Sequence, residues 1–321
     1  MKKFFALILA LVMSLSLVAC GGGDGDGSSA KLRFVTGGES GTYYAFGSVI
    51  AQHATNNAGI NVVGLVGNGS QANIEELQAG NADLAFCQSD VMAYAYQGTN
   101  IFDSKVDCFS TVAALYTEQV QIVTVNPSIK TVADLKGKNV SIGAAGSGVF
   151  FNAVDILGAY GLDVEKDINP TYQSFGDSAD ALKDGKIDAA FIVAGAPTTA
   201  ITDLATTKAV SLVSLDDEHI DKLLASSPYY TKCTIPADVY GLDADTTTVG
   251  VGAVILARDD VSEDAIYALC ADIFDNAANL VSSHAKYGEL NMEYAASITS
   301  VPYHAGAVKY FAEHNMTVAG K

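Results

Sequence analysis

Two short turns contain the residues of this sequence best suited to binding chemistry. Ser40 and Gly41 precede Thr42 in the first turn, and Ser147 precedes Gly148 in the second. Where a helix begins, its first N–H groups have no intrahelical partner, and serine or threonine hydroxyls add directed hydrogen bonds. Such a turn favours an anionic group such as a carboxylate. A single turn also has a purely structural explanation, because serine and glycine cap helices with nothing bound.

Other turns of similar composition follow apolar runs. Ligands of open α/β sheets bind beyond the carboxyl ends of the strands, where helices begin. The turns that match this description span 36–42, 67–71, 88–90, 143–148 and 194–198. We expect ligand contacts from Ser40, Gly41, Thr42, Tyr43, Tyr44, Ser70, Gln88, Ser89, Asp90, Ser147, Gly148, Val149, Gly195 and Pro197. Among these, Gln88, Ser89 and Asp90 are expected to select the ligand beyond its carboxylate, and the two tyrosines to form a wall.

Enzyme motifs are missing from the sequence. It has no P-loop, no G-x-G-x-x-G after a first strand and no G-x-S-x-G elbow. Ser283 and Lys286 match S-x-x-K, but its usual companion motifs are absent, so we interpret the match as chance. We therefore predict a binding protein without catalytic residues or a cofactor.

Cysteine and histidine spacing gives no metal signature. The cysteines after the leader show no C-x-x-C spacing, and the histidines form no i,i+4 pair around an acid. We therefore predict no metal site. Outside the cytoplasm one or two disulfides would be compatible with an even number of cysteines, but buried thiols fit the apolar surroundings of Cys87 and Cys270 equally well. The other two cysteines are Cys108 and Cys233.

The charge balance argues against nucleic acid as a partner. The formal net charge is −18, and it becomes −20 once the two leader lysines are removed. Arg33 and Arg258 are the only arginines. Phosphate binding depends on clustered cations, which this chain does not have.

The first residues have the pattern of a secretory signal. Lys2 and Lys3 precede 16 uncharged residues, a run that is short for a membrane-spanning helix. The run ends in Leu17-Val18-Ala19-Cys20, which resembles the lipobox of bacterial lipoproteins. We predict a signal peptide at 1–19, lipidation of Cys20 and a flexible tether at 20–29, where glycine, aspartate and serine predominate.

The remainder of the chain nearly repeats itself, which indicates two halves of similar fold. The turn that ends at Gly41 recurs 107 residues later at Gly148, with a strand before it and a helix after it. A helix, a glycine and a buried strand around Gly80 recur 105 residues later around Gly185.

Alternating strand and helix patterns predict an α/β protein with parallel sheets. The predicted strands are 32–36, 62–66, 83–87, 120–125, 139–143, 188–193, 210–214 and 248–257. Two crossings between the halves, at 121–125 and 248–257, predict a two-strand hinge. One lobe would comprise 30–122 plus 249–321, and the other 123–248.

An ordered series of short motifs resembles the TAXI family of TRAP-transporter solute receptors. The resemblance covers Lys31 to about Glu313. The motifs are Gly41–Tyr44, Gly69-Ser70 with Asn73, Gln88–Asp90, Ala114–Tyr116, Asp134–Lys138, Gly146–Gly148, Asp184–Ala189, Ala194–Pro197 and Pro302–Ala307.

This resemblance implies a bilobal, type II-like periplasmic binding fold. From the leader and the lipobox we expect a monomer that is lipid-anchored to the outer face of the cytoplasmic membrane, or a periplasmic one. The resemblance also implies delivery of glutamate, glutamine or a dicarboxylate to a TRAP-type membrane permease. Glu39 and Val149 depart from the usual family pattern, which leaves the ligand open. A binding lipoprotein of an ABC importer and a ligand-sensing module remain as alternatives.

Overall fold

The computed structural model describes residues 31–321. The predicted signal peptide, the lipidation site at Cys20 and the predicted tether lie outside the described residues. Within Lys31–Lys321 the chain forms one compact unit.

Strands and helices alternate along most of this unit. The strands are β1 (Lys31–Val35), β2 (Asn61–Leu65), β3 (Leu84–Gln88), β4 (Phe109–Thr124), β5 (Asn139–Ser141), β6 (Asn169–Thr171), β7 (Ala189–Ala194), β8 (Ser211–Leu212), β9 (Thr231–Ile235) and β10 (Thr246–Arg258). The α-helices are α2 (Thr42–Asn57), α3 (Ser70–Gln78), α4 (Ser89–Gln97), α5 (Val149–Ala159), α6 (Phe175–Lys183), α7 (Thr199–Ala205), α8 (Asp217–Ser226), α9 (Glu263–Asp275), α10 (Ala277–Leu280), α11 (Met292–Ala295) and α12 (Ala305–Glu313). Short 3₁₀ turns are η1 (Val132–Leu135), η2 (Ala237–Val239) and η3 (Ala285–Glu289).

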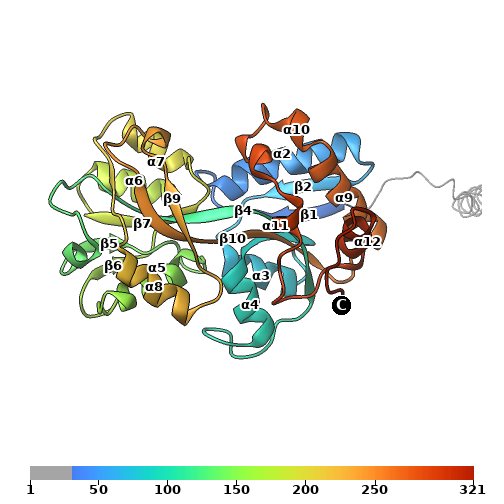
Figure 1. The fold of residues 1–321 in the computed structure, drawn as a ribbon, viewed down its shortest axis with the longest axis horizontal. Coiled ribbons are helices and arrows are strands. Elements are labelled where there is room, and N and C mark those ends of the chain that lie inside the picture. Colours follow the sequence, from blue (N-terminus) through green and yellow to red (C-terminus); the bar gives the residue numbers. More distant parts are fainter. Residues whose placement is uncertain (1–30) are drawn as a thin grey trace, which may run out of the picture. The chain divides into compact units, whose positions relative to one another are not determined.

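The strands of Lys31–Lys321 join in one ten-stranded sheet with the order β2-β1-β3-β10-β4-β7-β5-β6, in which β8 pairs with β4 and β9 with β10. We call β2, β1 and β3 the first half of the sheet, and β7, β5 and β6 the second half. The long strands β4 and β10 lie side by side between the halves (Figure 1). Both halves are therefore connected through the same two strands.

Strand direction agrees only in part with the predicted parallel sheets. Strands pair in parallel within each half, as β1 does with β2 and β3, and β5 with β6 and β7. The long strands instead run antiparallel to each other and to the strands beside them, β3 and β7. Strand β10 lies between β3 and β4 and runs antiparallel to both, so β3 and β4 run in the same direction without pairing with each other.

The long strand β4 begins well before the predicted 120–125. Its apolar and polar residues from Phe109 onward are buried almost throughout, so no alternation marks the start of the strand. The short strands β6 and β9 were missed because they contain no apolar run, and β8 has only two of the predicted residues 210–214.

The internal repeat is visible as the same pair of aspartate–backbone hydrogen bonds in both halves. The Asp83 carboxylate accepts a hydrogen bond from the Arg33 backbone N–H at 2.8 Å, and the Asp83 N–H donates to the Arg33 carbonyl at 2.9 Å. Asp188 makes the same two bonds with Asn139, at 3.0 and 2.8 Å. Each aspartate thus joins a turn to the start of the neighbouring strand. The glycine that ends the helix before each turn has φ near +70°.

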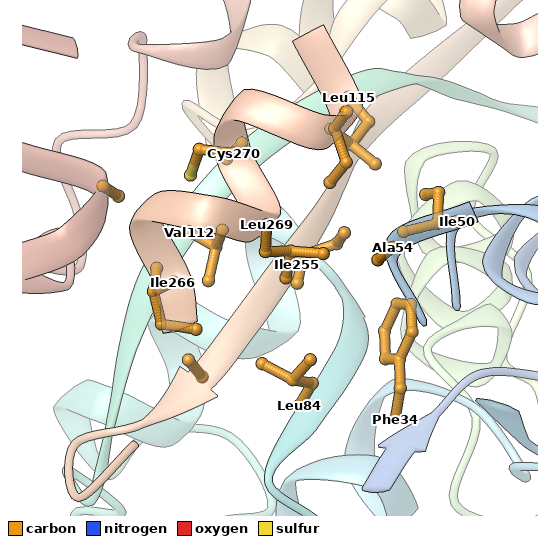
Figure 2. Packing of buried hydrophobic residues seen from close by; sticks show 14 of the residues in the cluster. Phe34, Ile50, Ala54, Leu84, Val112, Leu115, Ile255, Ile266, Leu269 and Cys270 are labelled. Atoms are coloured by element: carbon orange, nitrogen blue, oxygen red, sulfur yellow. The ribbon is translucent and has the colours of Figure 1, made fainter. Parts of the chain in front are cut away.

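Separate apolar clusters support the two halves. Ile266, Leu269 and Cys270 of α9 pack toward β4 and toward Ile255 of β10 (Figure 2). A second cluster joins α5 and α8 to β5, β7 and the other ends of the long strands. Burying one such aliphatic side chain contributes about 1.5–3 kcal/mol to the stability of the fold.

All four cysteines in the described part of the chain are free thiols. Cys87 and Cys270 are buried, so of the two alternatives for these residues, disulfides or buried thiols, the structure shows buried thiols. Within residues 31–321, no helix combines the length and apolarity that a membrane span requires.

Candidate ligand-binding cavity

A cavity of about 120 Å³ lies where the two halves of the sheet meet, and residues from both halves line it. A known engineered cavity of ~150 Å³ holds one benzene molecule, so the volume here suits a small molecule. The lining includes the turn before α2, the turn before α3, the end of β3, the turn before α5 and the start of α6.

Helix N-termini from both halves open onto this cavity. The N-cap residues of α2, α3 and α5 are Gly41, Gly69 and Gly148, and none of them supplies a side-chain cap. The N–H groups of the first two residues of each helix have no intrahelical partner and can donate to an acceptor in the cavity, and the helix dipole adds about half a positive charge at each N-terminus. In α6, by contrast, the Ser174 hydroxyl already accepts from the Asp177 N–H.

Glycine allows the two halves to approach closely. A Cβ on Gly148 would lie 1.8 Å from Oε1 of Gln88, and a Cβ on Gly69 would lie 2.9 Å from Cα of Ser147. Gly69 also has a φ of +108°, which an L side chain rarely adopts. Gly69 and Gly148 therefore have two effects. They leave the N-termini of α3 and α5 without a side-chain cap, and they allow the residues of the two halves to approach closely beside the cavity.

Direct hydrogen bonds link the two halves beside the cavity. The Thr42 hydroxyl donates to the Gly195 carbonyl at 2.8 Å, and the Ala200 N–H donates to the Ser40 carbonyl at 3.2 Å. On the α3 side, the Ala72 N–H donates to the Gly146 carbonyl at 3.0 Å. The structure is thus a closed arrangement in which both walls contact each other.

Two polar atoms at the cavity wall are buried without a partner. Oγ of Ser147 and Oε1 of Gln88 have no hydrogen bond to any residue in the described chain. An unpaired buried polar group costs about 1–3 kcal/mol. Both side chains line the cavity.

The most buried acid of the cavity is Glu118, a residue of β4 that is only 2% exposed. Its Oε2 accepts a hydrogen bond from the Tyr43 hydroxyl at 2.7 Å. Burial raises the pKa of Glu118 to about 8, although the hydrogen bond from Tyr43 opposes the shift. Burial and the nearby Glu118 also raise the pKa of Tyr43 well above its usual value.

A buried amide network joins the two halves behind the cavity. Asn152 of α5 accepts from Nε2 of Gln88 at 3.1 Å and donates to Oδ2 of Asp90 at 3.0 Å. Asn152 also donates to the Tyr230 hydroxyl, which donates to Asp155. Burial raises the pKa of Asp90 to about 7.

The structure brings many of the predicted site residues together. Those that line the cavity are Ser40, Gly41, Thr42, Tyr43, Ser70, Gln88, Ser147, Gly148 and Val149.

The other predicted residues lie elsewhere. Tyr44 is half-buried on α2, away from the lining, and Pro197 is exposed. Ser89 accepts from the Gly252 N–H, Asp90 is held by Asn152, and Gly195 accepts from Thr42.

Sequence reasoning missed four side chains of the lining, namely Glu118, Ser174, Phe175 and Val193. A signal for Glu118 was present, because it is the only charged residue in the 16 residues of β4. Ser174 and Phe175 begin α6 after the unpredicted strand β6, so no strand end pointed to them.

The cavity lining holds acids but no basic side chain. Among the described residues that line it, the acidic side chains are Glu39 and Glu118, and none is lysine, arginine or histidine. The described part of the chain also holds no cluster of three or more potential metal ligands.

A mixed sheet whose two parallel halves share two long antiparallel strands, with a cavity between the halves, is the arrangement of the periplasmic binding protein fold. The profile of the NMT1-like family matches residues 34–314, and the chain belongs to this family.

Solved structures of low identity share the fold. MatC from Rhodopseudomonas palustris, solved with bound malate, is 15% identical with a TM-score of 0.57, over 80% of this chain and 88% of that one. A Bordetella bronchiseptica RB50 protein is 18% identical with a TM-score of 0.53, over 89% of both chains. PhnD1 from Prochlorococcus marinus (MIT 9301), in complex with methylphosphonate, is 11% identical with a TM-score of 0.51, over 81% and 88%.

Proposed function

We propose that this chain is an extracytoplasmic solute receptor that captures a small carboxylate and delivers it to a TRAP-type membrane permease. The role is binding and transport, not catalysis. The observation that carries the proposal is the cavity where uncapped N-termini of α2, α3 and α5 converge from both halves of the sheet.

The carboxylate is held mainly by backbone N–H groups. Gly41 and Thr42 present the start of α2, and Gly148 and Val149 present the start of α5. The unpartnered Ser147 hydroxyl supplies a directed hydrogen bond. With no cationic side chain among the described lining residues, the helix ends are the source of positive potential for an anion.

Ligand capture is coupled to closure of two lobes, with β4 and β10 as the hinge. In this proposal one lobe comprises residues 30–122 plus 249–321 and the other residues 123–248. The bonds from Thr42 to Gly195 and from Ala72 to Gly146 form only when the walls meet. A ligand that contacts both walls favours the closed state because it has more contacts there than in the open state.

The delivery step rests on the TAXI resemblance and on the predicted lipid at Cys20. A lipid anchor and a tether would keep a monomeric receptor near its permease and raise the effective concentration of the pair. Incorporation of a fatty-acid label into the full chain, and its loss in Cys20→Ser, tests the anchor. Copurification with an ATPase subunit instead of a many-helix permease would assign the receptor to an ABC importer.

Binding is tested by calorimetry with a panel of amino acids and dicarboxylates. We expect Ser147→Ala to weaken binding of the best ligand by about threefold to tenfold, because one hydrogen bond contributes about 0.5–1.5 kcal/mol. Thr42→Ala should also weaken binding, through loss of the bond that joins the two walls.

Exposed Ser283→Ala serves as the matched control and should leave the affinity unchanged. If no carboxylate binds, or if both cavity variants bind like the wild type, the proposed site is wrong.

A further inference from the structure

The acidity of the cavity is difficult to reconcile with a dianionic ligand. Glu118 and Glu39 are the acidic side chains among the described lining residues, and none of those residues is lysine, arginine or histidine. The helix N-termini supply roughly half a positive charge each, enough to hold one carboxylate. A second carboxylate of the ligand would lie in the same small space as two acidic side chains.

Glu118 has no cationic partner among the described residues. Burial raises the pKa of Glu118, and the charge of Lys286 opposes this shift. The Lys286 ammonium group is, however, already hydrogen-bonded to the Ala196 carbonyl at 3.0 Å and paired with Glu289. Tyr43 engages one carboxylate oxygen of Glu118, Oε2, and the side chain lines the cavity. A buried carboxylate is costly unless a cation and hydrogen bonds satisfy it. A cationic group of the ligand would fill this role.

We propose that Glu118 is the specificity-determining residue of the cavity and binds an ammonium group of the ligand, while the helix N-termini hold its carboxylate. This inference rests on the proposed function and narrows its substrate class to zwitterions. Dicarboxylates that lack an amine are rejected.

The pH dependence of binding follows from the same arrangement. Burial raises the pKa of Glu118 to about 8, so below that pH the free protein holds a proton there. An ammonium group binds the ionised form and displaces the proton. Affinity for a zwitterion therefore rises from pH 6 to pH 8, by up to about tenfold per unit. The titratable groups that face Glu118 are Tyr43, Cys87, Asp90, Tyr116, Lys286 and Tyr294.

The test compares the full chain with its Glu118→Gln variant by calorimetry, using matched ligand pairs. L-Glutamate is paired with glutarate, and L-glutamine with glutaramate, so that each pair differs only in the α-amino group. Of L-glutamate and L-glutamine, we expect the one that binds the wild type more tightly to bind at least about tenfold more tightly than its analogue without the amino group. Hydrogen bonds between charged groups are stronger than those between neutral groups. Glu118→Gln should lose this preference and the pH dependence.

Glu76→Gln, an exposed substitution of the same type, is the control and should behave like the wild type. The pH profile of the unmodified chain tests the proposal even if Glu118→Gln fails to fold.

If wild type binds glutarate as tightly as L-glutamate, or if Glu118→Gln retains the preference for amines, the inference is overturned while the carboxylate receptor stands. Tighter binding at low pH would likewise overturn it, because Glu118 would then act as a protonated donor. If neither member of either pair binds the wild type, the proposed carboxylate ligand class fails as well.

Discussion

Asp90 is a single carboxyl group whose burial affects the stability of the whole chain. Its side chain is fully buried and is held by the Val91 N–H and by the amide of Asn152. Desolvation is the main reason that its pKa rises to about 7, and the nearby Asp155 adds to the shift. The folded state therefore binds a proton here that the unfolded state releases near pH 4.

We expect the free energy of unfolding to decrease as the pH rises from about 4 to about 7. A group with a raised pKa in the folded state contributes full stability below its unfolded pKa, and the contribution is lost as pH rises through the folded pKa. The slope has an upper limit of about 1.4 kcal/mol per pH unit for one group. Urea unfolding of the full chain at pH 5, 6, 7 and 8 measures it.

In Asp90→Asn the free energy of unfolding should decrease less steeply with pH. The decrease that remains comes from Glu118, whose pKa is also raised. Asp264→Asn is the control, because that side chain is 95% exposed. Equal slopes in the wild type and Asp90→Asn would contradict the assignment.

At the scale of elements, the starts of α3 and α5 are shaped for contact between the two halves. Gly69 has a positive φ and meets Ser147 across the cavity. Gly185 also has a positive φ, +70°, but a Cβ there would meet nothing within 4 Å. A substitution at Gly185 therefore introduces backbone strain without a contact between the two halves.

We expect Gly185→Ala to destabilise the fold by about 1 kcal/mol, because alanine is strained at positive φ. Gly69→Ala should destabilise it more, because a φ of +108° with a ψ of −174° is a conformation that essentially only glycine adopts. Only Gly69→Ala should also weaken ligand binding, by about tenfold or more, since its methyl group prevents the walls from meeting. Thermal unfolding and calorimetry measure the two effects. Equal ligand affinities in the two variants would contradict a role of Gly69 in closure.

At the scale of the whole described unit, Lys286 links segments far apart in sequence. It belongs to η3, whose Tyr287 packs in the apolar cluster of the first half, and it bonds to the Ala196 carbonyl after β7. Its Nζ also lies 5.2 Å from the centre of the Tyr116 ring. The S-x-x-K match that contains Lys286 is thus part of a structural contact.

We expect Lys286→Met to favour an open arrangement of the ligand-free chain and to lower ligand affinity severalfold, because the bond to Ala196 stabilises only the closed arrangement. X-ray scattering should show a larger radius of gyration. Lys309→Met is the control, because Lys309 also lies over a tyrosine ring, that of Tyr267, while its ion-pair partners among residues 31–321 are Glu263 and Asp264 of the nearby helix α9. An unchanged radius and affinity for Lys286→Met would rule out this role.

Several features of the fold and of the candidate site could be predicted from the sequence alone. The helix starts at Thr42 and Val149 agree with the prediction, as do the glycines at positive φ and the repeat around Asp83 and Asp188. These features follow from rules that act over a few residues, such as helix capping and the conformational freedom of glycine.

The tertiary structure decided which of these turns share one cavity and what else lines it. Thr42 and its acceptor Gly195 are 153 residues apart, and Glu118 reaches the cavity from a strand whose burial gave no alternating pattern. The antiparallel direction of β4 and β10 is likewise a property of the assembled sheet. Enclosure, burial and a raised pKa arise only when distant segments pack together, because each depends on the removal of water by residues that are not neighbours in sequence.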